Sequence, residues 1–95
     1  MVVVIVRFFG SIREASGIDA IDVPIEQDES VESLLRRLVV RFGEKLANTL
    51  YDSRKSLRRE ITLMVNGRNI ISLNSLNTKL QGNDLVFIFT SIVGG

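Results

Sequence analysis

Histidine, cysteine and tryptophan are absent from this chain of 95 residues, and proline occurs only once. Without histidine or cysteine, the chain lacks the usual zinc ligands and the commonest catalytic base and nucleophile. The lack of cysteine also excludes a disulfide framework, so nothing points to an oxidising compartment. We therefore expect no metal, no stably bound cofactor and no catalysis by this chain on its own.

The charges are nearly balanced, with 12 lysines and arginines against 11 aspartates and glutamates. A net charge of +1 gives no global field that would draw the chain to nucleic acid or to an anionic membrane. The longest apolar run, residues 1–6, is too short to span a bilayer and lacks the features of a secretory signal. We expect a cytoplasmic protein with no nucleic-acid or membrane partner.

The first strand is predicted over residues 2–9, a dense run of β-branched and aromatic residues. Alternation sorts its side chains by the position of Arg7, the only charge in the run. The core-facing set is Val4, Val6 and Phe8. The set on the face of Arg7 is Val3, Ile5 and Phe9. Gly10 and Ser11 are predicted to end the strand in a turn.

Further elements follow from spacing and turn chemistry. Residues 21–25 predict an antiparallel strand at a sheet edge, because Pro24 cannot donate a ladder hydrogen bond. A helix is predicted from about residue 31 to residue 42, with Ser30 as its N-cap. After a short helical turn and a charged loop, strands are predicted at 61–65, 68–71 and 85–89. The first two are joined by a type I′ turn at Asn66-Gly67.

This order predicts an α+β fold in which about five strands form one mixed sheet and one main helix packs across one face. The first and last strands, being the most apolar, are expected at its centre. The arrangement is that of a ubiquitin-like β-grasp. We expect residues 1–95 to form one such domain, with a flexible tail over residues 90–95.

The tail carries the strongest functional signal, because the sequence ends in Gly94-Gly95. A terminal carboxylate is ionised at neutral pH and can attack the α-phosphate of ATP. Glycine has no Cβ, so two glycines form a thin segment that can enter the active site of a partner enzyme. Ile92 and Val93 are expected to anchor the base of this segment by apolar contact with the partner.

Several segments resemble the MoaD/ThiS family of ubiquitin-like sulfur carriers. Residues 6–17 (VRFFGSIREASG) resemble the opening of those proteins, and residues 65–68 resemble their hairpin. The turn into the last strand and the final glycine pair are similar too. The length, and the extra segment around residues 44–60, are nearer to MoaD than to the shorter ThiS.

The resemblance implies a specific role, that of the small subunit of molybdopterin synthase. Gly95 would be adenylated with ATP by a ubiquitin-activating-type adenylyltransferase (MoeB-like) and converted to a thiocarboxylate. The synthase large subunit (MoaE-like) would use that sulfur to make molybdopterin. Gly94 would pass through the narrow channel of the partner, and Phe89 would help to form the surface that the partner contacts.

Other functions remain open at this stage. One is a protein modifier of the small archaeal modifier type, conjugated through Gly95 to lysines of target proteins. Others are a sulfur carrier for tRNA thiolation or thiamine synthesis, and a β-grasp interaction module with an inert tail. Thr90 and Ser91 stand where MoaD tails usually carry two prolines, which leaves the identity of the partner open.

Two surface features also bear on function. The outer face of the first strand, continued by Phe87 and Phe89, predicts an apolar docking surface for partners beside the tail. The alternatives are that a loop or a second copy covers this face, or that the faces are misassigned. The basic cluster Arg54, Lys55, Arg58 and Arg59 is interpreted as a solvated loop, with protein docking preferred to RNA binding as its functional alternative.

Overall fold

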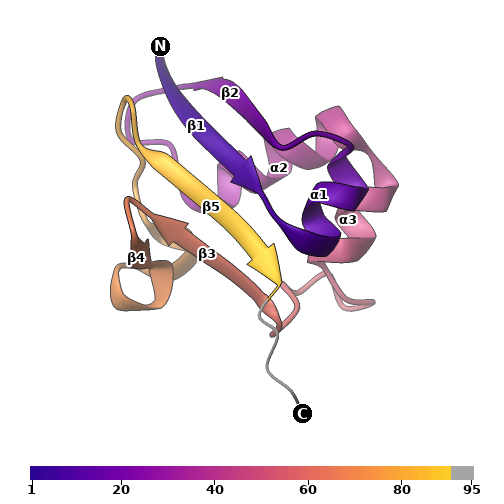
Figure 1. The fold of residues 1–95 in the computed structure, drawn as a ribbon. Coiled ribbons are helices and arrows are strands. Elements are labelled where there is room, and N and C mark those ends of the chain that lie inside the picture. Colours follow the sequence, from indigo (N-terminus) through magenta and orange to yellow (C-terminus); the bar gives the residue numbers. More distant parts are fainter. Residues whose placement is uncertain (91–95) are drawn as a thin grey trace.

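The computed structural model describes residues 1–90 (Figure 1). The elements follow in the order β1 (Val2–Phe8), α1 (Gly10–Ser16), β2 (Ala20–Ile25), α2 (Val31–Phe42), α3 (Glu44–Leu50), β3 (Ile61–Val65), β4 (Arg68–Asn69), two 3₁₀ turns (Ile70–Ser72 and Ser75–Asn77) and β5 (Leu85–Thr90). No helix in this part of the chain combines the length and apolarity needed to cross a bilayer.

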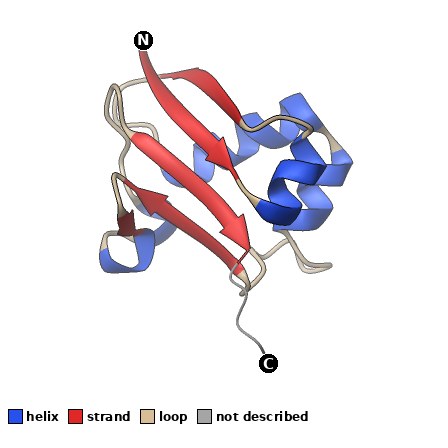
Figure 2. Cartoon of the chain, in the orientation of Figure 1, coloured by secondary structure: helices blue, strands red, loops and turns tan. Residues whose placement is uncertain are grey.

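The strands form one mixed sheet in the order β2-β1-β5-β3-β4. β1 pairs in parallel with β5, while β2 pairs antiparallel with β1 and β3 pairs antiparallel with β5. The first and last strands therefore lie inside the sheet, and Pro24 lies on an edge strand, as predicted. In the view of Figure 2, α2 passes behind the sheet and α1 and α3 lie to its right, so none of these three helices crosses the front face of the strands.

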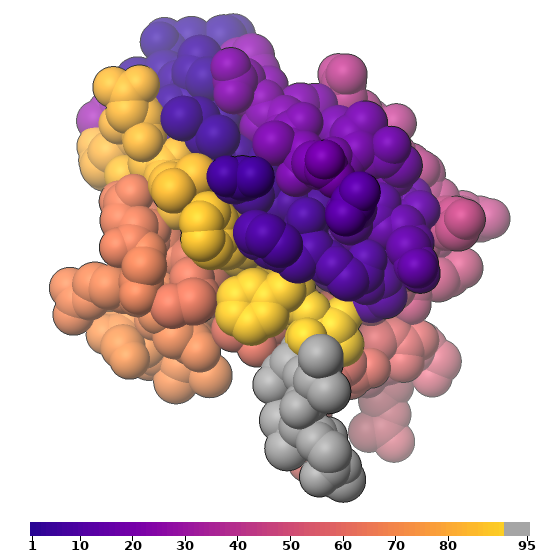
Figure 3. Space-filling view, viewed as in Figure 1, coloured from indigo at the N-terminus to yellow at the C-terminus, as the bar shows by residue number. Residues whose placement is uncertain are grey.

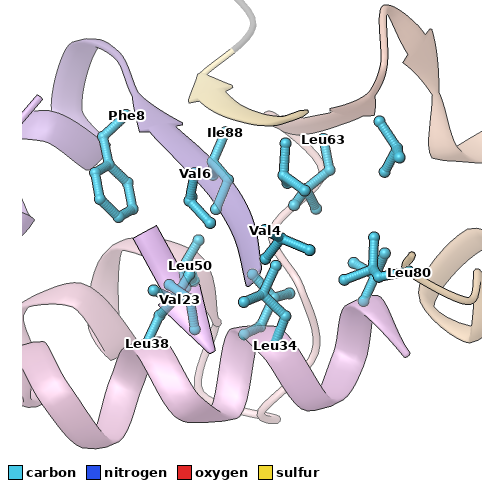
Figure 4. Packing of buried hydrophobic residues seen from close by; sticks show 14 of the residues in the cluster. Val4, Val6, Phe8, Val23, Leu34, Leu38, Leu50, Leu63, Leu80 and Ile88 are labelled. Atoms are coloured by element: carbon cyan, nitrogen blue, oxygen red, sulfur yellow. The ribbon is translucent and has the colours of Figure 1, made fainter. Parts of the chain in front are cut away.

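The hydrophobic core fills the space between the sheet and the helices. From β1 it receives Val4, Val6 and Phe8, none of which is more than 2% exposed. Figure 4 shows these side chains on one side of the core and Leu34 and Leu38 of α2 on the other. Because each such side chain contributes roughly 1.5–3 kcal/mol when buried, this layer supplies much of the driving force for folding.

Helix α2 confirms the predicted helix and its N-cap. The Ser30 hydroxyl accepts a hydrogen bond from the Ser33 N–H at 3.1 Å. The Glu29 carboxylate accepts from the Ser33 hydroxyl at 2.7 Å and from the Glu26 N–H at 2.9 Å. It also accepts a hydrogen bond from the Arg37 guanidinium at 2.9 Å. The bond to Arg37 is the main reason why the pKa of Glu29 falls from 4.5 to about 2, against the opposing effect of burial.

The first strand ends before Gly10, as predicted, but Gly10 and Ser11 begin a helix where the sequence indicated a turn. Helix α1 is stabilised by Ile12, which is fully buried. It ends at Gly17, which has a φ of 80° and whose N–H donates to the Arg13 carbonyl at 2.8 Å. A left-handed glycine is the usual way to end a helix.

Helix α3 occupies the segment for which the sequence predicted a short helical turn. Its Leu46 and Leu50 side chains are fully buried against the core. The helix layer therefore contains α2, as predicted, together with the shorter helices α1 and α3.

The hairpin after β3 confirms the predicted turn but not the predicted return strand. Asn66 and Gly67 have φ values of 53° and 83°, the positive pair that a type I′ turn requires. β4 comprises only Arg68–Asn69. The chain then forms a 3₁₀ turn, in which the Asn69 side chain accepts from the Ile71 N–H at 3.0 Å. This turn buries Ile70 and leaves Ile71 80% exposed.

The resulting architecture is a ubiquitin-like β-grasp. Parallel β1 and β5 lie inside a mixed sheet, and α2 packs across one face of that sheet. The fold class predicted from the sequence is confirmed.

Candidate functional site

The face of the sheet opposite the helices carries exposed apolar side chains. On β1, Val3 is 42% exposed and Ile5 is 36% exposed, and Phe9, just after the strand, is 39% exposed. Val4, Val6 and Phe8 point to the core. The predicted division of β1 into two faces is therefore confirmed, and the described residues leave Phe9 and Ile5 accessible to solvent.

Three phenylalanine rings gather at one end of this face. The ring centroids of Phe9 and Phe87 are 5.4 Å apart, and those of Phe9 and Phe89 are 6.4 Å apart. Their planes meet at 68° and 86°, the edge-on geometry that aromatic pairs favour. These rings line a shallow hollow of ≈ 470 Å³ together with Met64, Gly10 and Thr90. We call Phe9, Met64, Phe87 and Phe89 the aromatic patch.

Sheet register explains why these residues meet. Phe87 of β5 lies beside Arg7 of β1 on one side and Met64 of β3 on the other. Phe89 lies beside Thr62 in the next row on this face. The patch therefore combines side chains of β3 and β5 with that of the residue that follows β1. In the space-filling view of Figure 3, the yellow atoms of the last strand reach the surface between the indigo atoms of the N-terminal segment and the orange atoms of the middle of the chain.

The predicted docking surface included one residue that does not line the hollow, Ile5, and omitted one that does, Met64. Ile5 was predicted as part of the docking surface and lies on the correct face, but it pairs with Leu85 and does not line the hollow. Met64 lines the hollow and was missed. The available signal was the alternation of residues 61–65, because Ile61, Leu63 and Val65 are buried and Met64 points the other way.

The end of β5 is fixed to the helix layer. The hydroxyl oxygens of Ser11, in the first turn of α1, and Thr90, the last residue of β5, are 2.6 Å apart and share a hydrogen bond. Thr90, the last described residue, also lines the hollow of the aromatic patch. The predicted tail residues Ile92, Val93, Gly94 and Gly95 lie outside the described residues.

Charged groups are sparse around the patch, and the chemistry available there is binding by apolar contact. Arg7 is the charged residue that shares the face with Phe9 and Phe87 along β1 and β5. Within residues 1–90, no group of three or more aspartate or glutamate side chains is placed to hold a metal ion. The Asp84 carboxylate, just before β5, accepts hydrogen bonds from the Asn66 side-chain amide and from the Gln81 N–H.

Almost the entire chain can be matched to known proteins. The model of the ThiS family matches residues 6–95. Small archaeal modifier protein 3 from Haloferax volcanii is 29% identical, over 94% of this chain and 95% of that protein. The solution structure of small archaeal modifier protein 1 from Methanosarcina acetivorans is 29% identical and has a TM-score of 0.82, covering 100% of this chain and 98% of that one.

A further solved structure shares the fold at lower identity. It is a putative molybdopterin converting factor, subunit 1, from Pyrococcus furiosus, with a TM-score of 0.72 and 21% identity, covering 97% of this chain and 100% of that chain. The family match includes the end of β1, the helix layer, the strands of the aromatic patch and the Gly94-Gly95 pair. The chain belongs to the ThiS family of ubiquitin-like sulfur carriers.

Proposed function

We propose that this chain is a ubiquitin-like protein modifier of the small archaeal modifier type, attached through Gly95 to lysines of target proteins. The observation that carries the proposal is the likeness to small archaeal modifier protein 3, which spans nearly all of both chains. The match to the ThiS family extends through Gly95, which supports a role for the glycine pair. The sequence alone favoured molybdopterin synthesis, whereas the likeness to small archaeal modifier protein 3 supports the modifier.

The proposed reaction begins with activation of Gly95 by a ubiquitin-activating-type adenylyltransferase. The ionised carboxylate attacks the α-phosphorus of ATP, pyrophosphate leaves, and a Gly95 acyl-adenylate forms. The ε-amino group of a target lysine then attacks the activated carbonyl carbon. AMP leaves, one proton is released and an isopeptide bond forms. Hydrosulfide in place of the amine displaces AMP and yields the thiocarboxylate, so one activation serves both protein attachment and sulfur transfer.

In this proposal the aromatic patch is the docking surface for the activating enzyme. An exposed apolar cluster with an aromatic centre has the composition of a protein interface. The patch lies where β5 ends, so a partner bound there is well placed to receive Ile92, Val93 and Gly94. ATP is bound by the partner, and the chain itself holds no cofactor. We place these reactions in the cytoplasm, where ATP is available.

The second candidate is the small subunit of molybdopterin synthase. The resemblance of residues 6–17 and of the 65–68 hairpin to MoaD supports it. Under this function, the Gly95 thiocarboxylate donates its sulfur to a MoaE-like large subunit. Both candidates share the adenylation step, and they differ in the nucleophile that attacks afterwards.

Intact-mass spectrometry tests the shared step. The chain ending in Gly95 is incubated with ATP, the adenylyltransferase of its source organism and a sulfur donor, with a chain lacking Gly95 as the control. A mass gain equal to the exchange of one oxygen for sulfur, seen only with the intact chain, supports activation at Gly95. No change with a competent adenylyltransferase would exclude both candidates.

A second assay separates the two candidates. Expression of the tagged chain in its source organism should give conjugates of higher mass that disappear when Gly95 is deleted, and peptide sequencing should find Gly95 on a lysine. Molybdopterin synthesis restored by the thiocarboxylate and a synthase large subunit, without such conjugates, would replace the modifier with the synthase subunit.

A further inference from the structure

The segment between α3 and β3 concentrates positive charge. Residues 52–60, which we call the basic loop, contain Arg54, Lys55, Arg58 and Arg59. Arg54, Lys55 and Arg59 are exposed. Within residues 1–90 the ion pairs are Arg13–Asp19, Arg36–Glu32 and Arg37–Glu29, and none of them includes a basic-loop side chain.

The basic loop contains two acidic residues, Asp52 and Glu60, and within residues 1–90 only the Asp52 carboxylate of the two accepts hydrogen bonds. Glu60 is exposed beside Arg59, so the loop carries four positive and two negative side chains. The Asp52 carboxylate accepts hydrogen bonds from the Arg54 N–H at 2.9 Å and the Ser56 N–H at 3.1 Å. It therefore orders the backbone of the basic loop, and the side chains of Arg54 and Lys55 extend into solvent with their charges available.

Hydrogen bonds hold the backbone of the basic loop in a defined conformation. Tyr51 and Leu57 form an isolated β-bridge across its base, and the Arg58 N–H donates to the Leu50 carbonyl at 2.8 Å. The Arg58 Nε also donates to the Asn48 carbonyl at 3.0 Å. A loop held at several points presents its charges with little loss of conformational entropy on binding.

The backbone conformation of Lys55 suggests that the positive charge of this residue has a function. It has a φ of 62°, in the left-handed region where glycine or asparagine causes less strain. This conformation costs a residue with a Cβ roughly 1–2 kcal/mol. A lysine at this position adds a cation at the tip of the loop where an uncharged residue would suit the backbone better.

The basic loop lies at the end of the sheet where β5 ends. It leads directly into Ile61, the first residue of β3, and Ile61 is the register partner of Thr90 (Figure 1). A protein that receives the tail following Thr90 must place its own surface around this end of the sheet. The cations of the basic loop then meet that surface.

We propose that the basic loop docks on an acidic surface of the activating adenylyltransferase, beside the channel that receives the tail. This inference rests on the proposed function, because it assumes that the tail enters such an enzyme. Opposite charges at the rim of an interface act mainly on encounter and are sensitive to salt. RNA fits less well, because no aromatic residue lies among the cations to stack on bases and the net charge is only +1.

Charge reversal with a matched control tests the proposal. The test variant is Arg54→Glu/Arg59→Glu. The control is Arg68→Glu/Lys79→Glu, which makes the same change of charge at exposed residues near the opposite end of β3 and β5. Each chain, ending in Gly95, is titrated in an ATP–pyrophosphate exchange assay with the adenylyltransferase of its source organism, at low and at high salt. Circular dichroism checks that the variants are folded.

We expect the test variant to raise KM about tenfold at low salt with kcat within about twofold of the wild type, and the control to change KM by less than about twofold. The salt dependence of KM should flatten in the test variant only. The neutral variant Arg54→Gln/Arg59→Gln should have an intermediate KM, and it serves as the test if the reversed variant does not fold.

Three results would overturn the inference, and they have different consequences. No exchange with the wild-type chain and a competent enzyme would remove the proposed function together with this inference. Wild-type KM in both reversed variants, or equal changes in both, would remove only the inference. RNA binding that is lost in the test variant while KM stays unchanged would assign the basic loop to RNA in place of a protein.

Discussion

The Ser11 and Thr90 hydroxyl oxygens are 2.6 Å apart, which joins the first turn of α1 to the last residue of β5. Thr90 occupies a position where MoaD tails usually have proline. A proline stiffens the start of a tail through its fixed φ, whereas here a side-chain hydrogen bond holds the residue in place. We infer that this bond limits fraying of β5 at the point where the tail begins.

Removing this bond should loosen the end of β5 with a small cost in global stability. For Ser11→Ala we expect about 0.5–1 kcal/mol less free energy of unfolding, because the bond is exposed. Amide hydrogen exchange should accelerate at Phe89 and Thr90 more than at Val86. Ser72→Ala, at an exposed serine in the 3₁₀ turn, is the control and should change neither quantity. Unchanged exchange at Thr90 would show that β5 is held by its ladder alone.

Replacing a ring of the aromatic patch should weaken activation and leave the fold intact. Phe9→Ser removes edge-on contacts with Phe87 and Phe89 worth about 0.5–1.5 kcal/mol each. Phe9 is also the N-cap of α1, where serine stabilises a helix by about 1 kcal/mol, so part of the loss is offset. We expect a KM for adenylation at least about tenfold higher than that of the wild type, with a small change in Tm.

Val40→Ser is the matched control for the patch. Val40 lies on α2, away from the patch, and is 86% exposed. Its replacement removes a comparable exposed apolar side chain and should leave KM for adenylation unchanged. Equal changes of KM in the two variants would argue against the aromatic patch as the specific docking surface.

The elements predicted correctly from the sequence are those whose local signals agree. Helix α2 has twelve residues, an apolar stripe and a capping serine. The two faces of β1 could be assigned because Arg7 marks the solvent side of an otherwise apolar run. The sheet order followed from placing the most apolar strands in the interior.

The missed features depend on contacts that chain order does not reveal. Helix α1 is only seven residues long and begins at a glycine, so its sequence indicates a turn until Ile12 is seen buried in the core. The pair Ile70-Ile71 is typical of a strand, yet the Asn69 side chain starts a 3₁₀ turn there. Met64 joins the aromatic patch through register between β3 and β5, which are separated in sequence. The predictions for Ile92 to Gly95 stay predictions.

The Glu29–Arg37 pair should make the free energy of unfolding depend on pH in the acid range. Because the pKa of folded Glu29 is about 2, below its usual 4.5, ionised Glu29 stabilises the fold fully above about pH 5. That contribution is lost as the pH falls towards 2. Urea unfolding of the wild type and of Glu29→Gln should therefore differ most at pH 6 and converge near pH 2.

The control for this prediction is Glu60→Gln, at an exposed glutamate whose side chain makes no hydrogen bond within residues 1–90. It should not reproduce the acid-dependent difference. A constant gap between wild type and Glu29→Gln from pH 6 to pH 2 would mean that Glu29 acts through packing and not through its charge.

The side chain of Asn66 should stabilise the fold in addition to the turn conformation that its backbone adopts. Its φ of 53° is one that glycine adopts readily, so Asn66→Gly preserves the turn geometry. The substitution removes two bonds, because the Asn66 amide donates to the Asp84 carboxylate at 2.8 Å and its carbonyl oxygen accepts from the Leu85 N–H at 2.9 Å. These bonds tie the β3–β4 turn to the start of β5.

We expect Asn66→Gly to lower the free energy of unfolding by about 1–3 kcal/mol, measured by urea denaturation. Asn83→Gly is the matched control, because Asn83 also has a positive φ, of 69°, and its side chain makes no hydrogen bond within residues 1–90. Asn83→Gly should therefore change stability by less than about 1 kcal/mol. An equal loss in both variants would mean that the added freedom of the unfolded chain, and not the lost bonds to β5, accounts for the effect of Asn66.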